Sequence, residues 1–295
     1  MNAQQASTGS PPPKARGARR REWQLALPLT LLFLVFFVLP LGLLFIASLF
    51  SDASMTRLGL DQYVQLFSTP LSLQILRDTL WLGVQSTLVC ALLGFPLALA
   101  YCRASPRWQP LLIFLIILPQ LTSAVVRTFA WIVILGREGI INSTLLQLGI
   151  VADPLSLLYT NLGVVIALAQ IQLPLMVLPL INTLMRIEPN VLEASTVLGA
   201  GAFRTFRKII LPLSTPGLIA GSLLVFTTSV GAFVTQSVIG GGRLMYMPEY
   251  IYQLSIGAQN WPFAAAMTIL LLVTVLVTVI LFTWLGRKSM KHVEA

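Results

Sequence analysis

The segment Leu192–Gly217, "LEASTVLGAGAFRTFRKIILPLSTPG", decides the fold and lies between two long apolar stretches. It places a carboxylate and a basic cluster in one short span of a chain that is 56% hydrophobic and only 10% charged. Ordinary soluble domains carry about 25% charged residues. Because a chain with so few charges cannot cover a globule with polar groups, we infer that lipid is its solvent.

Six apolar stretches are long enough to cross a bilayer, which takes about 20 residues of helix. Their continuous apolar character favours helices over the short alternating strands of a barrel. We therefore predict an all-α polytopic membrane protein with six transmembrane helices. The predicted spans are Leu25–Phe50, Thr79–Tyr101, Leu111–Leu135, Leu162–Met185, Leu213–Thr235 and Pro262–Leu285.

Prolines interrupt two of these spans, namely Pro119 in the third and Pro174 and Pro179 in the fourth. Kinks in lipid persist only where neighbouring helices or polar groups satisfy the freed backbone. The sequence therefore predicts packed helices around a path.

Basic residues alternate between the two sides of the predicted spans. Fourteen of the 19 basic residues lie before the first span, after the second, between the fourth and fifth, or after the sixth. The three opposite loops carry only Arg57, Arg77, Arg137 and Arg243. Basic loops stay in the cytoplasm, so we expect both termini inside, as an even number of spans requires. The net charge of +9 is thus explained without nucleic acid as a partner.

Residues 1–22 are predicted to be a disordered basic cytoplasmic tail, and residues 23–295 to be the transmembrane domain. Arg19, Arg20 and Arg21 before an apolar run suggest a twin-arginine signal as one alternative. The apolar run is too long for such a signal, and five more spans follow, so we interpret these arginines as an orienting cluster.

The sequence contains no pattern for bond chemistry. It has no P-loop, no G-x-S-x-G elbow and no H-E-x-x-H pair. The single histidine, His292, lies outside the spans, and no carboxylate lies inside one. Cys90 and Cys102 lie about 18 Å apart along one predicted helix, which is too far for a disulfide. We therefore predict no catalytic residue, no metal site and no cofactor bound by this chain.

Arg127 is an ionisable residue within the predicted third span, in an unusually polar run. A charge in the membrane usually faces a cavity or a partner. Arg127 either braces a kinked helix and reaches the outer interface, or it lines a translocation path. The candidate path residues are Arg127, Trp131, Gln170, Gln172, Thr235 and Gln236. Each neutral one among them also fits an interhelical hydrogen bond.

The segment at about residues 186–212 is predicted to be two short helices joined by a bend. Asn190 can cap the first helix, Glu193 can reach back to complete a capping box, and Gly199 stops it. A second helix over residues 202–211 would end at Pro212.

The second short helix is expected to have one apolar and one basic face. The apolar face would hold Phe203, Phe206 and Ile210, and the basic face Arg204, Arg207 and Lys208. Such a segment can lie on anionic lipid headgroups, merely connect two spans, or dock into a groove on a partner. Docking alone gives a role to the cap, the glycine and both helices.

A specific pattern runs through this segment. Glu193-Ala194-Ser195, three residues, Gly199, nine residues, Ile209, one residue and Leu211-Pro212 match E-A-A-x(3)-G-x(9)-I-x-L-P, apart from one serine. The pattern resembles the signature of the permease subunits of binding-protein-dependent ABC importers. The resemblance implies a type I importer permease (MetI-like) fold in a bacterial inner membrane.

In that family the loop is the coupling helix, which sits in a cleft of an ATPase subunit. The resemblance therefore implies a second permease, as a heterodimer, two ABC ATPases that bind ATP and Mg, and a periplasmic or lipid-anchored solute-binding protein. The coupling residues implied are Glu193, Ala194, Ser195, Gly199, Ile209, Leu211 and Pro212.

A narrower resemblance is to the spermidine/putrescine-type permeases. It rests on Leu118-Pro119 with Thr122-Ser123 and Arg127, on residues 174–180, and on Trp261-Pro262-Phe263. The implied cargo is a polyamine or a related amine. The same features also resemble importers of phosphonate-type solutes such as an aminoalkylphosphonate, and the lack of an intramembrane acid argues against strong cation selection by this chain alone. An ion-coupled secondary transporter is the alternative of another class, and it leaves the docking segment without a role.

The outer loop from Gly240 to Gln259 begins with three glycines and Arg243. Glycines give the backbone freedom, so the loop is either a flexible connector or a surface that meets the binding protein. The candidate contact residues are Gly241, Gly242 and Arg243. We also expect a short helix from Pro248 onward.

Overall fold

The structure is a computed structural model that describes residues 27–290, without the side chains of residues 285 and 287–290. The predicted tail at residues 1–22 and His292 lie outside the described residues. The described chain is helical between its connections, which confirms the all-α prediction. After a helical start at residue 27 the elements are η1 (Leu34–Val38), α2 (Leu39–Ala47), α3 (Asp61–Ser68), α4 (Pro70–Arg103), α5 (Gln109–Ile117), η2 (Leu118–Leu121), α6 (Ala124–Leu135), α7 (Ile140–Gln147), α8 (Asn161–Leu184), α9 (Pro189–Val197), α10 (Ala202–Thr205), η3 (Phe206–Ile210), α11 (Leu211–Val230), α12 (Phe233–Gly240), α13 (Met247–Tyr252), η4 (Gln253–Gly257) and α14 (Trp261–Met290).

Five of these helical stretches are long and apolar enough to cross a membrane, and a bent pair forms a sixth candidate. The five are Leu27–Ala47, Pro70–Arg103, Asn161–Leu184, Ala202–Val230 and Trp261–Trp284. The bent pair is Gln109–Leu121 with Ala124–Gln147. Each of the six predicted spans therefore has a helical counterpart, although the third and fifth differ in form.

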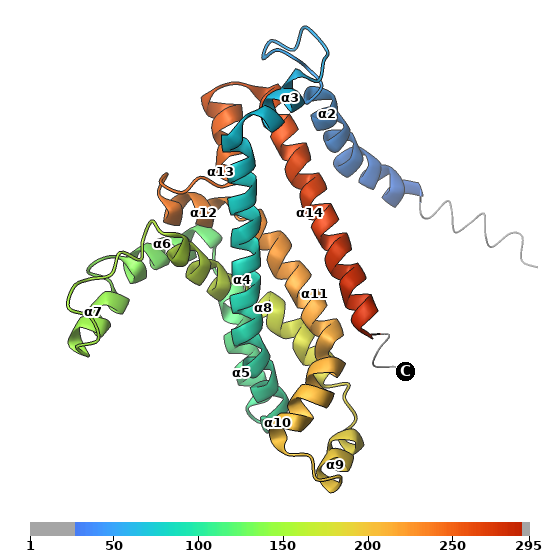
Figure 1. The fold of residues 1–295 in the computed structure, drawn as a ribbon, viewed down its shortest axis with the longest axis vertical. Helices are drawn as coiled ribbons and strands as arrows, with labels where there is room; N and C mark the ends of the chain where they lie inside the picture. The colour runs from blue at the N-terminus through green and yellow to red at the C-terminus, as the bar shows by residue number, and fades with distance from the viewer. Residues whose placement is uncertain (1–26, 291–295) are drawn as a thin grey trace, which may run out of the picture.

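The centre of the molecule is a bundle of α4, α8 and α11, which pack against one another along their lengths (Figure 1). Apolar residues from all three helices form its core, including Cys90, Met176 and Val225. The thiol of Cys90 donates to the carbonyl of Ala169 at 3.3 Å. Cys90 and Cys102 are both free, as predicted.

Helices α8 and α11 approach each other at two glycines spaced four residues apart. A Cβ on Gly221 would lie 2.8 Å from Met176 Sδ, and one on Gly217 would lie 2.7 Å from the carbonyl oxygen of Pro179. Small residues at this spacing allow close backbone contact between helices in a membrane. The side-chain-free faces of Gly217 and Gly221 thus set the distance between these two spans.

The prediction that Pro174 and Pro179 interrupt the fourth span is wrong, because α8 runs unbroken through both. Proline removes one helical hydrogen bond and leaves one carbonyl without its donor. The carbonyls without their usual donor are those of Gln170 and Leu175, four residues before each proline. Packing against α4 and α11 holds the remainder of the helix in place.

The third span is broken more sharply than predicted. Its two halves meet at an angle of 97°, and Thr122 and Ser123 between them are extended. The carbonyl of Pro119 accepts hydrogen bonds from the Thr122 hydroxyl, at 2.9 Å, and from the Arg127 guanidinium. Polar side chains thus satisfy the backbone where the helix stops, and α6 and α7 project sideways from the bundle (Figure 1).

The fifth span was predicted as Leu213–Thr235, but the helix starts earlier and ends earlier, at Ala202 and Val230. Pro212 does not end the preceding helix. A π-helical turn, η3, comes just before it, and the amide of Leu211 donates to the carbonyl of Phe206. The wider turn accommodates a proline that cannot donate to the chain behind it. Thr235 and Gln236 therefore lie on the separate helix α12.

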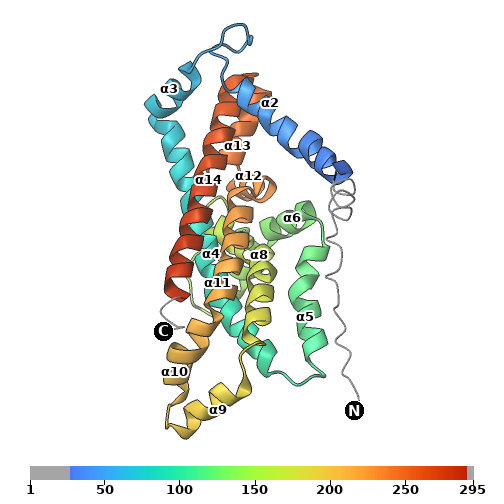
Figure 2. The ribbon, with the colours of Figure 1, turned by 90° about the vertical axis from the view of Figure 1, so that its right-hand side faces the viewer.

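The two ends of the molecule differ in their elements. The α9 end carries α9 and α10, and the α3 end carries α3 and α13 (Figure 2). Helix α14 packs against α11, α3 and α13. The first span contacts α14 through α2. Its apolar stretch is otherwise exposed in the described structure, and it diverges from the bundle in both ribbon views.

Candidate functional site

The α9–α10 segment, residues 189–210, has the predicted bend at Gly199. Gly199 adopts a φ of +74°, which side chains disfavour. Around it the amide of Gly199 donates to the carbonyl of Thr196 at 3.0 Å, and the amide of Ala200 donates to the carbonyl of Ser195 at 2.9 Å. These bonds close the helix end in the manner of a glycine C-cap, so the glycine stop is confirmed.

The predicted capping box is wrong. Helix α9 begins at Pro189, its N-cap residue is Glu188, and no side chain caps it. Asn190 and Glu193 both lie inside the helix. Proline at the first helical position lacks the amide that a cap would satisfy, and its fixed φ suits a helix start. Pro189 therefore starts this helix, and neither Asn190 nor Glu193 caps it.

Ser195 fastens the two short helices together. It is 4% exposed, and its hydroxyl lies 3.1 Å from Thr205 Oγ1 on α10 while donating to the carbonyl of Leu192 at 2.8 Å. The one residue that departs from the E-A-A pattern thus makes the polar contact across the bend. Ala194 and Glu193 lie exposed beside it.

The inner face of the segment packs onto the bundle. Ile210 is buried in the main core, and Phe206 and Leu211 pack against that core. The rings of Phe206 and Phe95 meet edge to face, with centroids 5.5 Å apart. Ile209 and Pro212 are half-buried.

The outer face of the segment presents apolar and basic side chains. Phe203 was predicted to share a face with Phe206 and Ile210, which is wrong, because it is 75% exposed. The π-helical turn that starts at Phe206 rotates Phe206 and Ile210 toward the bundle and leaves Phe203 outside. Val197 and Leu198 on α9 are 86% and 84% exposed. Arg204, Arg207 and Lys208 are exposed, as predicted.

A second feature is a pocket of about 380 Å³ beside the broken third span. It is lined by Gln120, Ala124, Leu168, Ile171, Gln172, Leu175, Thr228 and residues 231–235. Gln172 and Thr235, two of the predicted path residues, lie here. The Gln172 amide is 2.6 Å from Thr228 Oγ1 and 3.0 Å from Ser229 Oγ, so α8 and α11 share hydrogen bonds at the pocket wall.

Four of the predicted path residues, Arg127, Trp131, Gln170 and Gln236, do not line this pocket, and hydrogen bonds join the helices near it. Trp131 Nε1 donates to Gln170 Oε1 at 3.1 Å, which joins α6 to α8. Gln236 is fully buried and donates to the carbonyl of Ser229 at 2.7 Å. Thr235 Oγ1 lies 3.3 Å from Thr128 Oγ1, which joins α12 to α6. Interhelical hydrogen bonds therefore hold the pocket together.

Arg127 braces the break in the third span. Its guanidinium donates to the carbonyl of Pro119 one helix away along the chain, and its Nε has no partner among the described residues. Arg127 is half-buried and does not line the pocket. Of the two roles considered from the sequence, this geometry favours the structural one.

The glycine-rich outer loop is tightly packed at its start. Gly241 and Gly242 adopt φ values of +58° and +70°. A Cβ on Gly241 would meet the ring of Tyr159 at 2.1 Å, and the Arg243 guanidinium lies 5.4 Å from the centroid of the same ring. Tyr159 itself has a φ of +63° and donates its amide to the carbonyl of Ile239. The loop start is therefore held by a cation–π contact, and the predicted short helix follows as α13.

Sequence reasoning missed a hydrogen-bonded chain near the α3 end. Asn161 Nδ2 donates to Gln85 Oε1 at 2.8 Å, and the Tyr246 hydroxyl donates to Asn161 Oδ1 at 3.0 Å. Burial, followed by the nearby negative charge of Asp78, raises the pKa of Tyr246 to about 12. Single polar residues in otherwise apolar spans, such as Gln85, were the available signal.

No group of three or more His, Cys, Asp or Glu side chains converges on a metal-sized site within residues 27–290. The contacts seen at the α9–α10 segment and at the pocket are hydrogen bonds and apolar packing.

Comparison with known proteins gives a consistent answer. The chain is 35% identical over 256 residues to the "Spermidine/putrescine transport system permease protein PotB" of Haemophilus influenzae, covering 85% of this chain and 88% of that protein. A crystal structure of a bacterial ABC transporter that imports the acidic polysaccharide alginate contains a chain that superposes with a TM-score of 0.76, at 21% identity, over 92% of this chain and 97% of that one. A crystal structure of a bacterial alginate ABC transporter in complex with an alginate pentasaccharide-bound periplasmic protein gives a TM-score of 0.72 at 21% identity, over 93% of this chain and 97% of that one. Residues 18–291 match the model of the binding-protein-dependent transport system inner membrane component, and the chain therefore belongs to that family of ABC importer permeases.

Proposed function

We propose that this permease transmits ATP-driven movement of partner ATPases through its α9–α10 segment to a solute path beside α8 and α11, and that its cargo is a polyamine. The observation that carries the proposal is the two-sided construction of the segment. Its inner face is packed onto the bundle through Phe206 and Ile210, while Val197, Leu198 and Phe203 remain exposed on the outside. A rigid element with an exposed apolar face is suited to seat in a partner's cleft.

The bend makes the segment act as a lever. The glycine turn at Gly199 and the Ser195–Thr205 contact fix α9 relative to α10. Helix α10 continues through η3 into α11 without a break. Force applied to α9 therefore reaches the hydrogen bonds beside the pocket, where Thr228 and Ser229 of α11 meet Gln172 of α8.

The α9 end is proposed to face the cytoplasm. The exposed Arg103, Arg107, Arg186, Arg204, Arg207 and Lys208 lie in the connections at that end, and basic loops stay inside. With helices crossing in alternation, both termini would be cytoplasmic and the protein would be multi-pass in a bacterial inner membrane.

The remaining partners follow from the family. A second permease would complete the path, two ABC ATPases would bind ATP and Mg, and a periplasmic or lipid-anchored binding protein would deliver the cargo. The α3 end offers the surface for that delivery, with Gly241, Gly242 and Arg243 as the candidate contact. The alginate transporter was solved with such a periplasmic protein, which supports this arrangement.

A polyamine is the proposed cargo because of the relative at 35% identity. Within the described residues the pocket is lined by neutral polar and apolar side chains, so the ammonium groups would find amide and hydroxyl oxygens here and their charge partners on the second permease. A phosphonate-type cargo is less supported, because the nearby cation, Arg127, is engaged with Pro119.

The coupling proposal is tested at Gly199. A Cβ there meets no atom within 4 Å, so substitution acts through the left-handed backbone alone. Gly199→Val should lose ATPase co-purification and ATP-dependent uptake, whereas Gly199→Asn, which tolerates a positive φ, should keep most of both. If both variants behave like the parent, or if vesicles take up cargo without ATP and ATPases, the chain is an ion-coupled transporter instead.

The cargo is tested separately with the purified solute-binding partner and the reconstituted complex. We expect saturable uptake of labelled spermidine or putrescine that an excess of aminoalkylphosphonate does not inhibit. Inhibition by the phosphonate, with none by polyamines, would replace the cargo and leave the coupling proposal intact.

A further inference from the structure

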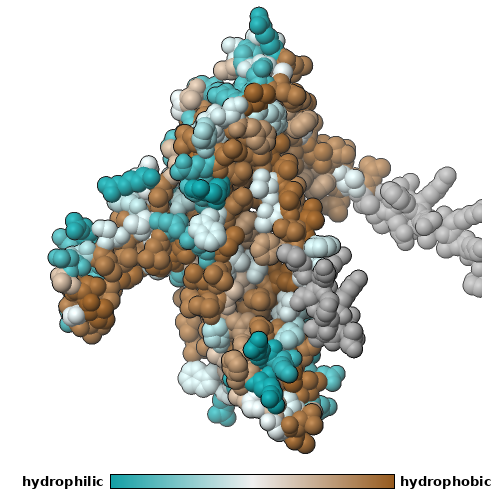
Figure 3. Space-filling model, in the orientation of Figure 1, coloured by the Kyte–Doolittle hydropathy of each residue, from teal (hydrophilic) through white to brown (hydrophobic). Residues whose placement is uncertain are grey.

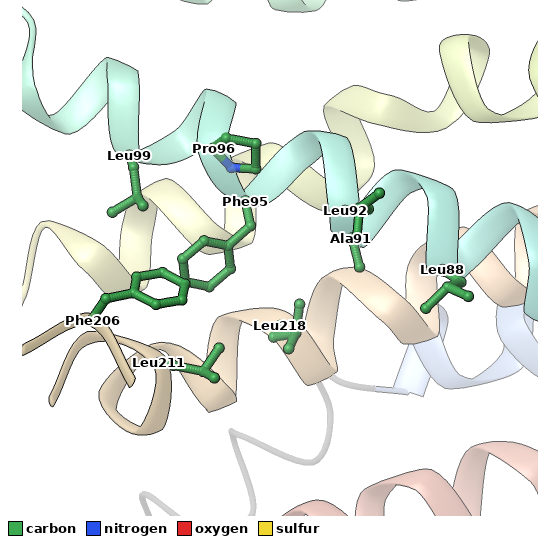
Figure 4. A pocket seen from close by; sticks show the side chains of 9 residues that line it. All are labelled: Leu88, Ala91, Leu92, Phe95, Pro96, Leu99, Phe206, Leu211 and Leu218. Carbon is green, nitrogen blue, oxygen red and sulfur yellow. The ribbon is translucent and has the colours of Figure 1, made fainter. Parts of the chain in front are cut away.

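An apolar groove runs along the outside of the bundle between α4 and the start of α11. It has a volume of about 350 Å³ and is lined by Leu88, Ala91, Leu92, Phe95, Pro96, Leu99, Phe206, Leu211 and Leu218. Figure 4 shows Leu88 and Leu99 of α4 on the side of that helix that faces α11, with the rings of Phe95 and Phe206 meeting between Leu99 and Leu211. Every lining side chain is a hydrocarbon, so the groove has no means of holding a polar solute.

The length of the groove matches one membrane leaflet. On α4 it extends from Leu88 to Leu99, which is about 16 Å at 1.5 Å per residue. One leaflet contributes about half of a hydrocarbon core that is about 30 Å thick. A single acyl chain that lies along α4 therefore has the length to fill the groove.

Three basic residues follow the groove-lining residues Leu99 and Phe206 along the chain. Arg103 lies one helical turn beyond Leu99 on α4, Arg207 follows Phe206, and Lys208 lies in the same π-helical turn. All three are exposed. Figure 3 shows hydrophilic residues gathered over this part of the α10–η3 region, next to a largely hydrophobic flank. A positive cluster at the end of an apolar groove is complementary to a negatively charged headgroup joined to an acyl chain.

We propose that this groove binds one acyl chain of an anionic phospholipid, whose phosphate is held by Arg103, Arg207 and Lys208. The acyl chain of the lipid lies between α4 and α11 and ends against Leu88. The headgroup lies at the level of η3. The carboxylates nearest to the α10–η3 turn in sequence are Glu188 and Glu193, and among the described residues no salt bridge joins either of them to Arg103, Arg207 or Lys208.

The bound lipid would affect the position of the α9–α10 segment. Phe206 both lines the groove and contacts Phe95, so an acyl chain in the groove presses the α9–α10 segment against the bundle. This consequence rests on the proposed function, whereas lipid binding does not. The binding measurement below therefore fails or succeeds independently of transport.

The test uses the full-length protein, extracted from membranes with its bound subunits, and native mass spectrometry. We expect phosphatidylglycerol to remain bound through detergent exchange and phosphatidylcholine to be lost. Each basic residue near an anionic headgroup contributes on the order of fivefold in binding, so Arg207→Gln combined with Lys208→Gln should weaken phosphatidylglycerol retention by about tenfold or more.

Two variants fill the groove itself, and one controls for general lipid contact. Ala91→Phe and Leu88→Trp should each abolish retention; Leu88 is exposed, so the second variant does not depend on repacking the core. Leu276→Phe lies on the exposed face of α14, outside the groove, and should retain lipid like the parent. Equal retention of both lipids, equal loss in Leu276→Phe, or unchanged retention in both groove variants would each overturn the proposal. So would efficient cross-linking of a Leu92→Cys variant to a second permease, because the groove would then hold protein.

Discussion

The ring of Phe206 in η3 meets the ring of Phe95 in α4 edge to face, with centroids 5.5 Å apart. This contact joins the α9–α10 segment to a helix other than the one into which it continues. Movement of α9 is therefore opposed at two points, by the covalent continuation into α11 and by this ring pair. The proposed lever acts against the bundle and does not swing freely from one helix.

Removing this contact should uncouple ATP hydrolysis from uptake. Phe206→Ala removes an aromatic pair worth about 0.5–1.5 kcal/mol beyond its packing. We expect the reconstituted complex to hydrolyse ATP at a rate near that of the parent while uptake per ATP falls several-fold. Phe203→Ala, an exposed residue of the same segment, separates this effect from seating in the ATPase, because it should reduce ATPase co-purification instead. Parallel losses of hydrolysis and uptake in Phe206→Ala would contradict the two-point attachment.

The close approach of α8 and α11 should not tolerate side chains at the glycine positions. Gly221→Leu would place its side chain against Met176, and overpacking of this kind costs about 1–3 kcal/mol. The purified variant should melt at a lower temperature and be recovered in lower yield. Ala220→Leu is the matched control, since Ala220 is exposed on the same helix. Equal melting temperatures for the two variants would show that the helices are not in contact at Gly221.

The serine that departs from the E-A-A pattern should contribute stability through its partner. Ser195→Ala and Thr205→Val each remove one side of the contact across the bend, and a typical hydrogen bond contributes about 0.5–1.5 kcal/mol. A double-mutant cycle of thermal or chemical unfolding should give a coupling energy of that size. Strictly additive effects would mean that the two hydroxyls act independently.

The phenol of Tyr246 should ionise only at strongly alkaline pH because of its surroundings in the outer loop. Its pKa is raised to about 12 from an ordinary value of 10, because burial and the charge of Asp78 disfavour the phenolate. With the folded pKa raised, the stability that the neutral hydroxyl contributes is fully present below about pH 10 and is lost as the pH rises through 12. The absorbance titration of the parent minus that of Tyr246→Phe should have its midpoint near 12. A midpoint near 10 would place this hydroxyl in water.

Arg127 should affect the break in the third span more than cargo selection. Arg127→Gln removes a donor to the carbonyl of Pro119, and Thr122→Val removes the other. In both variants the melting temperature and the maximal uptake rate should fall. The KM for the cargo should change less than about threefold, because neither substitution removes a contact to the cargo. A tenfold change in KM confined to Arg127→Gln would assign that side chain to the path.

Much of the architecture followed from local patterns. Hydrophobic length located the spans, and the glycine at position 199 located the bend, because only a residue without a Cβ adopts a positive φ at little cost. The capping box failed because Pro189 begins α9 and leaves no role for Asn190. The fate of the prolines was less predictable. Pro119 lies at a break and Pro174 inside an unbroken helix, since the outcome depends on which neighbouring groups satisfy the freed carbonyl.

The residues around the pocket were also predicted only in part from the sequence. Their polarity within apolar spans marked Gln172 and Thr235 as candidates, but polarity alone does not distinguish residues that line the pocket from residues that do not. Thr235 lines the pocket and its neighbour Gln236 does not, because α12 is a separate helix that packs against α6 and α8.

The sequence by itself determined the solvent of this protein, the count of its spans and the bend in its docking segment, because these depend on hydrophobic length and on backbone freedom at single residues. Only the tertiary structure decided which polar groups share the pocket, what Arg127 holds and which face of the α9–α10 segment remains free. Those outcomes depend on contacts between residues far apart in the chain, and the rotation of one helix against another is set by packing, which no local pattern encodes.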